Sequence, residues 1–154
     1  MEIINVKGRT KPLPEDLAIA LGTFDGVHRG HIKIIDAVVK KAHGKKTAVY
    51  TFSNIPATAL GIAEKKQLST LEQKAEFISK LGIDYFLYEE FDAATASQTP
   101  EEFEDFLVNV LRAKYLVTGF NYTYGYKAGG TAEALKEHMG KRGIPVTIIS
   151  PVMS

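Results

Sequence analysis

A short apolar run, followed by a glycine-rich turn and an amphipathic segment, constrains the fold of this chain most strongly. Residues Leu17–Leu21 are all apolar, which is typical of a strand buried on both faces of a sheet. From Ile32 to Ala42 the apolar residues recur at helical spacing, with charged residues between them. Residues 22–31 therefore join a strand to a helix. The free N–H groups and the positive dipole end at the start of that helix favour an anionic ligand.

The alternation of strand and helix continues along the chain. The sequence predicts further strands at residues 46–52, 85–88, 115–118 and 145–149, and helices that begin at Ser69 or Thr70 (ending at Gly82), at Thr99 and at residue 131. The helix start at Thr99 is well marked, because a capping threonine, a proline and a capping-box glutamate follow one another there. Strands that alternate with helices imply right-handed crossovers. We therefore expect one α/β domain over residues 1–154, with three layers around a five-stranded parallel sheet.

The composition excludes several classes of function. The formal net charge of +1 gives no general attraction to nucleic acid or to anionic membranes. The absence of cysteine excludes disulfides, thiolate chemistry and cysteine-based zinc sites. No apolar run approaches the ~20 residues that span a bilayer, and residues 1–5 lack the features of a signal peptide. We expect a cytoplasmic protein that binds neither nucleic acid nor membrane. Its oligomeric state is left open.

Charge is unevenly distributed along the chain. Basic residues gather in 28–46 and acidic residues in 89–105. A basic face beside the glycine-rich turn suits a polyphosphate ligand, although solvated helix faces explain most such runs.

Three turns are candidate walls of a binding site. Ligands of parallel sheets bind beyond the carboxyl ends of the strands, where the strand order reverses, so we expect a site formed by residues 22–31, 52–56 and 119–130. In the first turn His28 and His31 supply imidazole groups for phosphate chemistry, in which positioning and charge neutralisation do most of the work. A metal site is the competing interpretation, but it lacks a third ligand at a recognisable spacing. The isolated His43 and His138 are interpreted as surface or core residues.

Several of these segments carry a resemblance to a known family. Leu21-Gly22-Thr23, followed by Phe24-Asp25-Gly26-Val27-His28-Arg29-Gly30-His31, resembles the first motif of the bacterial FAD synthetases. These are bifunctional riboflavin kinase/FMN adenylyltransferases within the His-x-Gly-His nucleotidyltransferases. Thr51-Phe52, residues 68–74, residues 82–85 with Phe91, and residues 119–125 resemble further motifs of that family in the same order. The resemblance therefore covers essentially the whole chain.

The resemblance implies a Rossmann-like nucleotidyltransferase fold and an FMN adenylyltransferase activity. Such an enzyme transfers AMP from ATP, bound with Mg²⁺, to FMN, and releases FAD and pyrophosphate. The implied catalytic residues are His28, His31 and Asn121. The implied nucleotide-binding residues are Gly22, Thr23, Phe24, Asp25, Gly26, Gly30 and Gly119. The implied flavin-binding residues are Phe52, Asn54, Tyr122 and Tyr124, although the tyrosines of this loop are equally explained as residues that pack the loop on the sheet. The ligands of the metal are not identified.

Three departures from the family pattern bear on these roles. Where the family has Thr-Phe-x-Pro-His-Pro, this chain has Asn54-Ile55-Pro56 after Ser53, and residues 126–131 keep one lysine without the usual aspartate. The Ser-Ser/Thr-Thr-x-x-Arg motif and the riboflavin kinase domain do not follow. Arg142 is interpreted as a solvated charge at a helix end. We expect no kinase activity and a reduced transferase activity. Two alternatives stay open: a nucleotidyltransferase for another phosphorylated small molecule, and a degenerate nucleotide- or flavin-binding protein without turnover.

Overall fold

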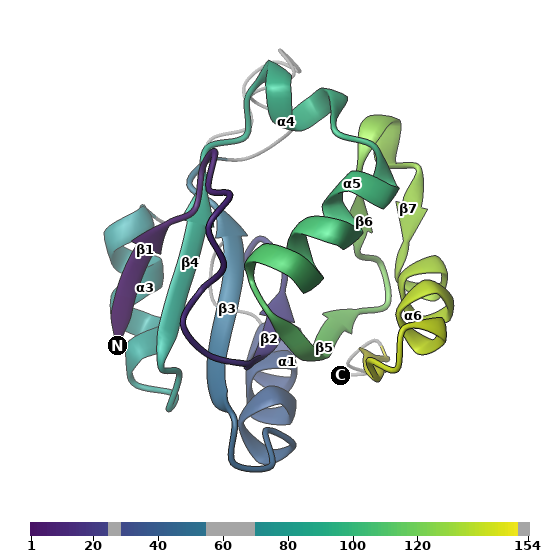
Figure 1. Ribbon diagram of the computed structural model, residues 1–154. Helices are drawn as coiled ribbons and strands as arrows, with labels where there is room; N and C mark the ends of the chain where they lie inside the picture. The colour runs from purple at the N-terminus through teal and green to yellow at the C-terminus, as the bar shows by residue number, and fades with distance from the viewer. Residues whose placement is uncertain (25–28, 55–69, 151–154) are drawn as a thin grey trace.

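The computed structural model describes residues 1–24, 29–54 and 70–150, and its centre is a parallel sheet (Figure 1). The sheet has six strands in the order β1-β4-β3-β2-β5-β8. The strands are β1 (Glu2–Asn5), β2 (Leu17–Leu21), β3 (Lys46–Phe52), β4 (Tyr85–Glu89), β5 (Ala113–Gly119) and β8 (Val146–Ile149). The prediction of an α/β fold with a parallel sheet is confirmed, but the predicted count of five strands is wrong. The sequence does not predict β1, because its side chains are mostly exposed and form no apolar run.

Helices and a small hairpin connect these strands. They are α1 (Arg29–Lys40), α3 (Leu71–Ser79), α4 (Ala93–Ser97), α5 (Pro100–Asp105), a π-helical turn η1 (Phe106–Val110), the hairpin β6 (Thr123–Tyr124) and β7 (Gly130–Thr131) around the 3₁₀ turn η2 (Tyr126–Ala128), and α6 (Ala132–Lys141). The predicted helix starts are confirmed, since Thr70 and Thr99 each cap a helix with a full capping box. Ser69, the alternative cap, lies outside the described residues.

Alternate residues of the buried strands face two different cores, which gives the three layers. In β2, Leu17, Ile19 and Leu21 pack with α5, η1 and α6 on one face. Ala18 and Ala20 pack with α1 and α3 on the other face. Both faces of β2 are therefore covered, as its continuous apolar run predicts. None of the helices in the described ranges has the length and apolar composition needed to cross a membrane.

The strand order reverses beside β2. From β2 the chain adds β3 and then β4 on one side, and it returns to add β5 on the other side. The turns that follow β2 and β5 must therefore diverge at the carboxyl end of the sheet, which opens a crevice between them. The short helix α4 lies at this same end of the molecule (Figure 1).

Candidate active site

A cavity of about 660 Å³ opens beyond the carboxyl ends of β2, β3 and β5, and its volume is within the usual range for small-molecule sites. Its lining is mostly apolar and aromatic, and Lys127 is the one charged side chain among the described residues that form it. The lining consists of Leu21, Gly22, Thr23, Ile34, Tyr50, Thr51, Phe52, Phe91, Thr95, Ala96, Gln98, Phe103, Gly119, Asn121, Tyr122, Thr123, Tyr124, Gly125, Tyr126, Lys127 and Ala128. Described residues of the turns after the first, second and fourth predicted strands thus line one cavity, as expected, and their role as a binding site stays a prediction.

The turn after β2 is held by a side chain of β3 and by close packing of its own residues. The Thr51 hydroxyl donates a hydrogen bond to the backbone oxygen of Thr23 (2.8 Å). A Cβ on Gly22 would lie 3.1 Å from the ring of Phe24, which is buried, so a glycine relieves this close approach. The Phe24 ring in turn meets the imidazole of His31 edge-on, with 5.4 Å between ring centroids. His31 thus packs on Phe24 in the first turn of α1, and neither of these two side chains is part of the cavity lining.

The first turn of α1 is the part of this site with the strongest preference for an anion. The α1 helix is 12 residues long and carries no acidic residue in its first turn, so its N–H groups and dipole are not offset there. Gly30 lies in this turn. Asp25, Gly26 and His28 lie outside the described residues.

The turn after β5 approaches the same helix. A Cβ on Gly119 would lie 3.4 Å from both the Asn121 side-chain oxygen and the Ile34 side chain of α1. Asn121 is exposed and lines the cavity. The α1 helix therefore bridges the two turns, with Gly22 and Thr23 on one side and Gly119 and Asn121 on the other.

Two stacked tyrosines form the wall of the cavity on the side of the β6–β7 hairpin. The rings of Tyr122 and Tyr124 are nearly parallel, at 23°, with 6.0 Å between centroids. The Tyr124 hydroxyl donates a hydrogen bond to buried Glu104 (2.7 Å), whose carboxylate also pairs with Nδ1 of His138 (2.8 Å). Both tyrosines therefore line the cavity and also pack the loop onto the core, and their contact with flavin stays a prediction.

Burial and a nearby carboxylate keep the tyrosine hydroxyls protonated. Tyr50 donates a hydrogen bond to Glu89 (2.6 Å), and burial together with that carboxylate raises the pKa of Tyr50 well above its usual value. Burial, followed by the Glu89 charge, raises the pKa of Tyr122 in the same way. The hydroxyl of Tyr122, a residue of the cavity lining, therefore keeps its proton and can donate a hydrogen bond.

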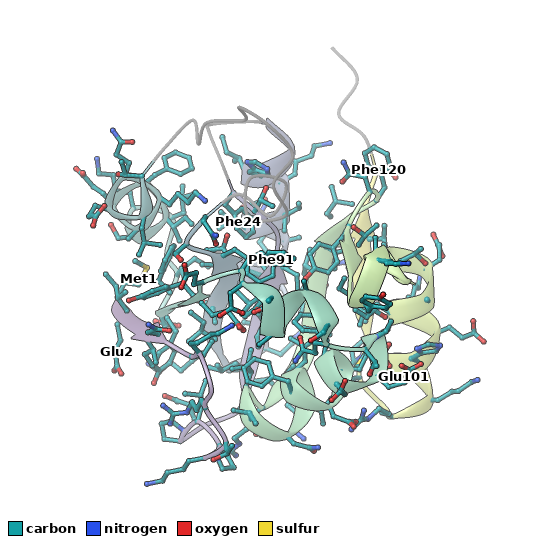
Figure 2. All side chains as sticks on the ribbon, turned by 90° about the horizontal axis from the view of Figure 1, so that it is seen from above. Met1, Glu2, Phe24, Phe91, Glu101 and Phe120 are labelled. Carbon is teal, nitrogen blue, oxygen red and sulfur yellow. The ribbon has the colours of Figure 1, made fainter. Side chains whose placement is uncertain are left out.

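Asn54 reaches the cavity through another residue. Its side-chain oxygen accepts a hydrogen bond from the backbone N–H of Phe91 (2.8 Å), and its side-chain nitrogen donates to the Phe91 carbonyl (3.0 Å). The Phe91 ring meets Phe52 edge-on at 5.1 Å. In the view onto the carboxyl end of the sheet, Phe24 and Phe91 lie near the middle of the molecule (Figure 2). Asn54 thus positions an aromatic wall residue.

Sequence reasoning missed part of the lining. Tyr50 and Thr51 precede the predicted turn by one or two residues, and their place at the carboxyl end of a strand is the signal that points to them. Thr95 and Gln98 come from α4 and its end, where no apolar pattern predicts a helix. Arg142, expected to be a solvated charge, forms an ion pair with Asp105 at 2.9 Å.

Comparison with known proteins identifies a family and several relatives of this chain. Residues 10–154 match a family model described as FAD synthetase. The bifunctional riboflavin kinase/FMN adenylyltransferase of Listeria monocytogenes is 37% identical over 139 residues, covering 85% of this chain and 43% of that protein. An FAD synthetase of the same organism is 30% identical over 136 residues, covering 85% of this chain and 54% of that protein. The chain thus spans about half the length of these relatives, or less.

Solved structures agree on the architecture. A Streptococcus pneumoniae structure described as a macrolide-efflux protein has a TM-score of 0.84 at 27% identity, covering all of this chain and 51% of that one. Pantothenate synthetase of Thermus thermophilus, at 13% identity, shares the fold alone, with a TM-score of 0.61 over 98% of this chain and 61% of its own. The family match over residues 10–154 and the gathering of the motif-bearing turns around one cavity lead to the same conclusion: this chain belongs to the FAD synthetase family.

Proposed function

We propose that this chain is an FMN adenylyltransferase domain, which transfers AMP from ATP to FMN. An oxygen of the FMN phosphate attacks the α-phosphorus of ATP. The bond from that phosphorus to the bridging oxygen breaks, FAD forms and pyrophosphate leaves. The observation that carries the proposal is the cavity itself, because it extends from an aromatic chamber to the turn after β2 and to Ile34 of α1, the helix whose first turn favours an anion, at the point where the strand order reverses.

The walls of the cavity suggest how the two substrates divide it. An isoalloxazine ring is planar and largely apolar, so it suits the chamber of Phe52, Phe91, Tyr122 and Tyr124, where ring contacts add to the burial of apolar area. The Tyr122 hydroxyl then offers a hydrogen bond to a polar edge of the ring.

We assign the phosphates of ATP to the opposite side, against residues 22–31 and Asn121. There His28 and His31 neutralise charge at the α- and β-phosphates, and Asn121 orients the reacting groups. Gly22 and Gly119 allow Phe24, Asn121 and Ile34 to pack closely against the two turns. Mg²⁺ enters as part of the MgATP substrate, bound by phosphate oxygens and by water. ATP and FMN would be met in the cytoplasm, and neither nucleic acid nor a membrane takes part in this reaction.

The direct test is to mix the purified chain with FMN and MgATP and to follow FAD and pyrophosphate. We expect FAD to form, and we expect its rate to fall about 10²–10³-fold in His28→Ala and in His31→Ala, as for loss of one charge-stabilising group. His43→Ala, which removes an exposed imidazole beyond α1, is the matched control and should leave the rate unchanged.

Other outcomes identify the alternatives. Turnover with CTP or with another phosphorylated acceptor, but not with FMN, indicates a different nucleotidyltransferase. Flavin or nucleotide binding without pyrophosphate release indicates a binding protein. An unchanged rate in both His28→Ala and His31→Ala refutes the assigned mechanism.

A further inference from the structure

One wall of the cavity is a short segment that has little apolar anchorage of its own. The segment runs from Phe91 through α4 to Gln98, and Phe91, Thr95, Ala96 and Gln98 line the cavity. The α4 helix has five residues, and none of them is buried. It contacts the η2 turn across the cavity mouth. So short a helix with no buried side chain depends on polar contacts to keep its place.

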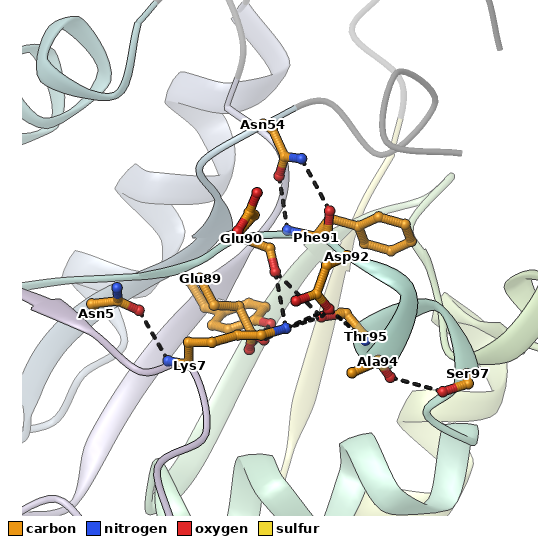
Figure 3. A network of polar contacts seen from close by, with 11 residues as sticks. Asn5, Lys7, Asn54, Glu89, Glu90, Phe91, Asp92, Ala94, Thr95 and Ser97 are labelled. Atoms are coloured by element: carbon orange, nitrogen blue, oxygen red, sulfur yellow. Dashed lines mark hydrogen bonds and ion pairs between the residues drawn. The ribbon is translucent and has the colours of Figure 1, made fainter. Parts of the chain in front are cut away.

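The first polar contact comes from the N-terminal strand. β1 pairs in parallel with β4, with Asn5 opposite Tyr88, so the chain leaves both strands at the same end of the sheet. Lys7 lies just beyond β1, and its ammonium group donates hydrogen bonds to Asp92 (2.7 Å), Thr95 (2.5 Å) and the backbone oxygen of Glu90 (3.2 Å) (Figure 3). The Lys7 side chain thus binds two residues of the segment, Asp92 and Thr95, and the backbone of Glu90 just before it.

The same ammonium group also lies over a buried charge. It is 3.7 Å from the carboxylate of Glu89, which is 8% exposed and accepts a hydrogen bond from the cavity residue Tyr50. Asp92 completes the arrangement from within the segment. It caps α4 by accepting from the Thr95 N–H (3.0 Å), and its bond to Lys7 is the main reason that the pKa of Asp92 falls to about 2. The helix cap and the buried carboxylate therefore share one cation.

The second polar contact comes from the end of β3. The side-chain amide of Asn54 pairs with both the N–H and the carbonyl of Phe91, as a neighbouring strand would (Figure 3). The family pattern has proline at this position, and a proline side chain has no such groups. The pairing is a feature of this chain, and it gives the wall segment a second anchor beside that of Lys7.

From these contacts we propose that Lys7 and Asn54 are positioning residues that set the affinity of the cavity for its flavin acceptor. They hold in place residues 91–98, four of which line the same cavity as Tyr122 and Tyr124. Neither of them is part of the cavity lining, and the side-chain hydrogen bonds within the described residues join both of them to the wall segment and its approach, so they act on acceptor binding and not on the chemical step. This inference rests on the proposed function.

The test compares steady-state kinetics of Lys7→Met, Asn54→Leu and wild type, with FMN and MgATP varied in turn. Since each substitution removes charged or paired hydrogen bonds, we expect the KM for FMN to rise about tenfold. We expect kcat and the KM for MgATP to change less than about twofold, because the contacts to ATP are not touched. Lys7→Arg, which keeps the cation, should restore most of the affinity. Lys11→Met, in an exposed position, is the matched control.

Hydrogen exchange supplies a readout that is independent of turnover. Saturating FMN should slow exchange of the amides in residues 91–98 in wild type, and this protection should be weaker in both variants. Circular dichroism and thermal melts show whether each variant is folded. If Lys7→Met does not fold, Asn54→Leu alone provides the test.

The outcomes separate this inference from the function on which it rests. A wild-type chain that forms no FAD overturns the proposed function and this assignment with it. A wild-type chain that turns over, with an unchanged KM for FMN in both variants, overturns the assignment alone. A fall in kcat with an equal rise in both KM values, or unfolding of both variants, also overturns it. Either result would show that the contacts stabilise the whole fold and do not act on acceptor binding in particular.

Discussion

Replacing Gly130 by alanine tests how the tyrosine wall is built. A Cβ at this position would lie 2.4–2.6 Å from three atoms of the Tyr124 ring, far inside normal contact distance. Any movement of the ring, into the cavity or elsewhere, disturbs the contacts that hold it. It packs against Phe103 at 5.4 Å on one side and Tyr122 at 6.0 Å on the other, and its hydroxyl is bonded to Glu104. Gly130→Ala must therefore displace the ring, the hairpin or both.

The expected cost follows from the contacts that such a displacement breaks. Forcing an extra methyl group into a packed site costs about 1–3 kcal/mol. Loss of the bond from Tyr124 to the buried Glu104 carboxylate adds about 1–3 kcal/mol. The free energy of unfolding should thus fall by about 2–6 kcal/mol, which for a domain of this size lowers Tm by at least about 4 °C.

Thermal unfolding followed by circular dichroism measures this loss, and another glycine provides the control. Gly140 lies in α6, and a Cβ added there would meet no atom within 4 Å, so Gly140→Ala should stabilise the protein by about 0.5–1 kcal/mol through helix propensity. In a Tyr124→Leu background the clashing ring atoms are gone, and Gly130→Ala should cost much less. A Tm for Gly130→Ala equal to that of wild type, or the same loss in both backgrounds, would refute this account of the wall.

Two further predictions concern stability. Burial is the main cause that raises the pKa of Glu89 above its usual 4.5. As the pH falls, Glu89 therefore binds a proton at a higher pH in the folded chain than in the unfolded chain. Wild type should therefore gain stability relative to Glu89→Gln as the pH is lowered from 7 towards 4.5, and chemical denaturation of both proteins across that range checks it; a pH-independent difference contradicts it. Thr99→Ala removes the side chain that caps α5 and should cost about 1 kcal/mol, or about 2–4 °C in Tm by calorimetry. An unchanged Tm would mean that the π-helical turn after α5 supports this helix without its cap.

Elements whose signals are local were predictable from the sequence. The bounds of β2 and β3 match the predicted strands, because full burial of a strand leaves a continuous apolar run. The caps at Thr70 and Thr99 were predictable because a capping box depends on residues only three positions apart. The general place of the site was predictable as well, since glycine-rich turns follow strands that a parallel sheet must align.

Elements that exist through distant partners were not predictable. β1 has exposed side chains and is a strand only because β4 supplies its hydrogen bonds. The α4 helix has no buried residue, and its place depends on Lys7, which lies more than 80 residues away in the chain. The family resemblance implies that Asn54 contacts flavin, whereas its amide pairs with the backbone of Phe91.

The sequence by itself therefore determined the alternation of the buried strands with the capped helices, and the family, because these depend on residues close together in the chain. Only the tertiary structure decided which strands flank β2, which side chains enclose the cavity and what holds its α4 wall. The physical reason is that strand pairing and buried polar contacts, such as those of Glu89 with Tyr50 and Lys7, join segments whose separation in sequence carries no local signal.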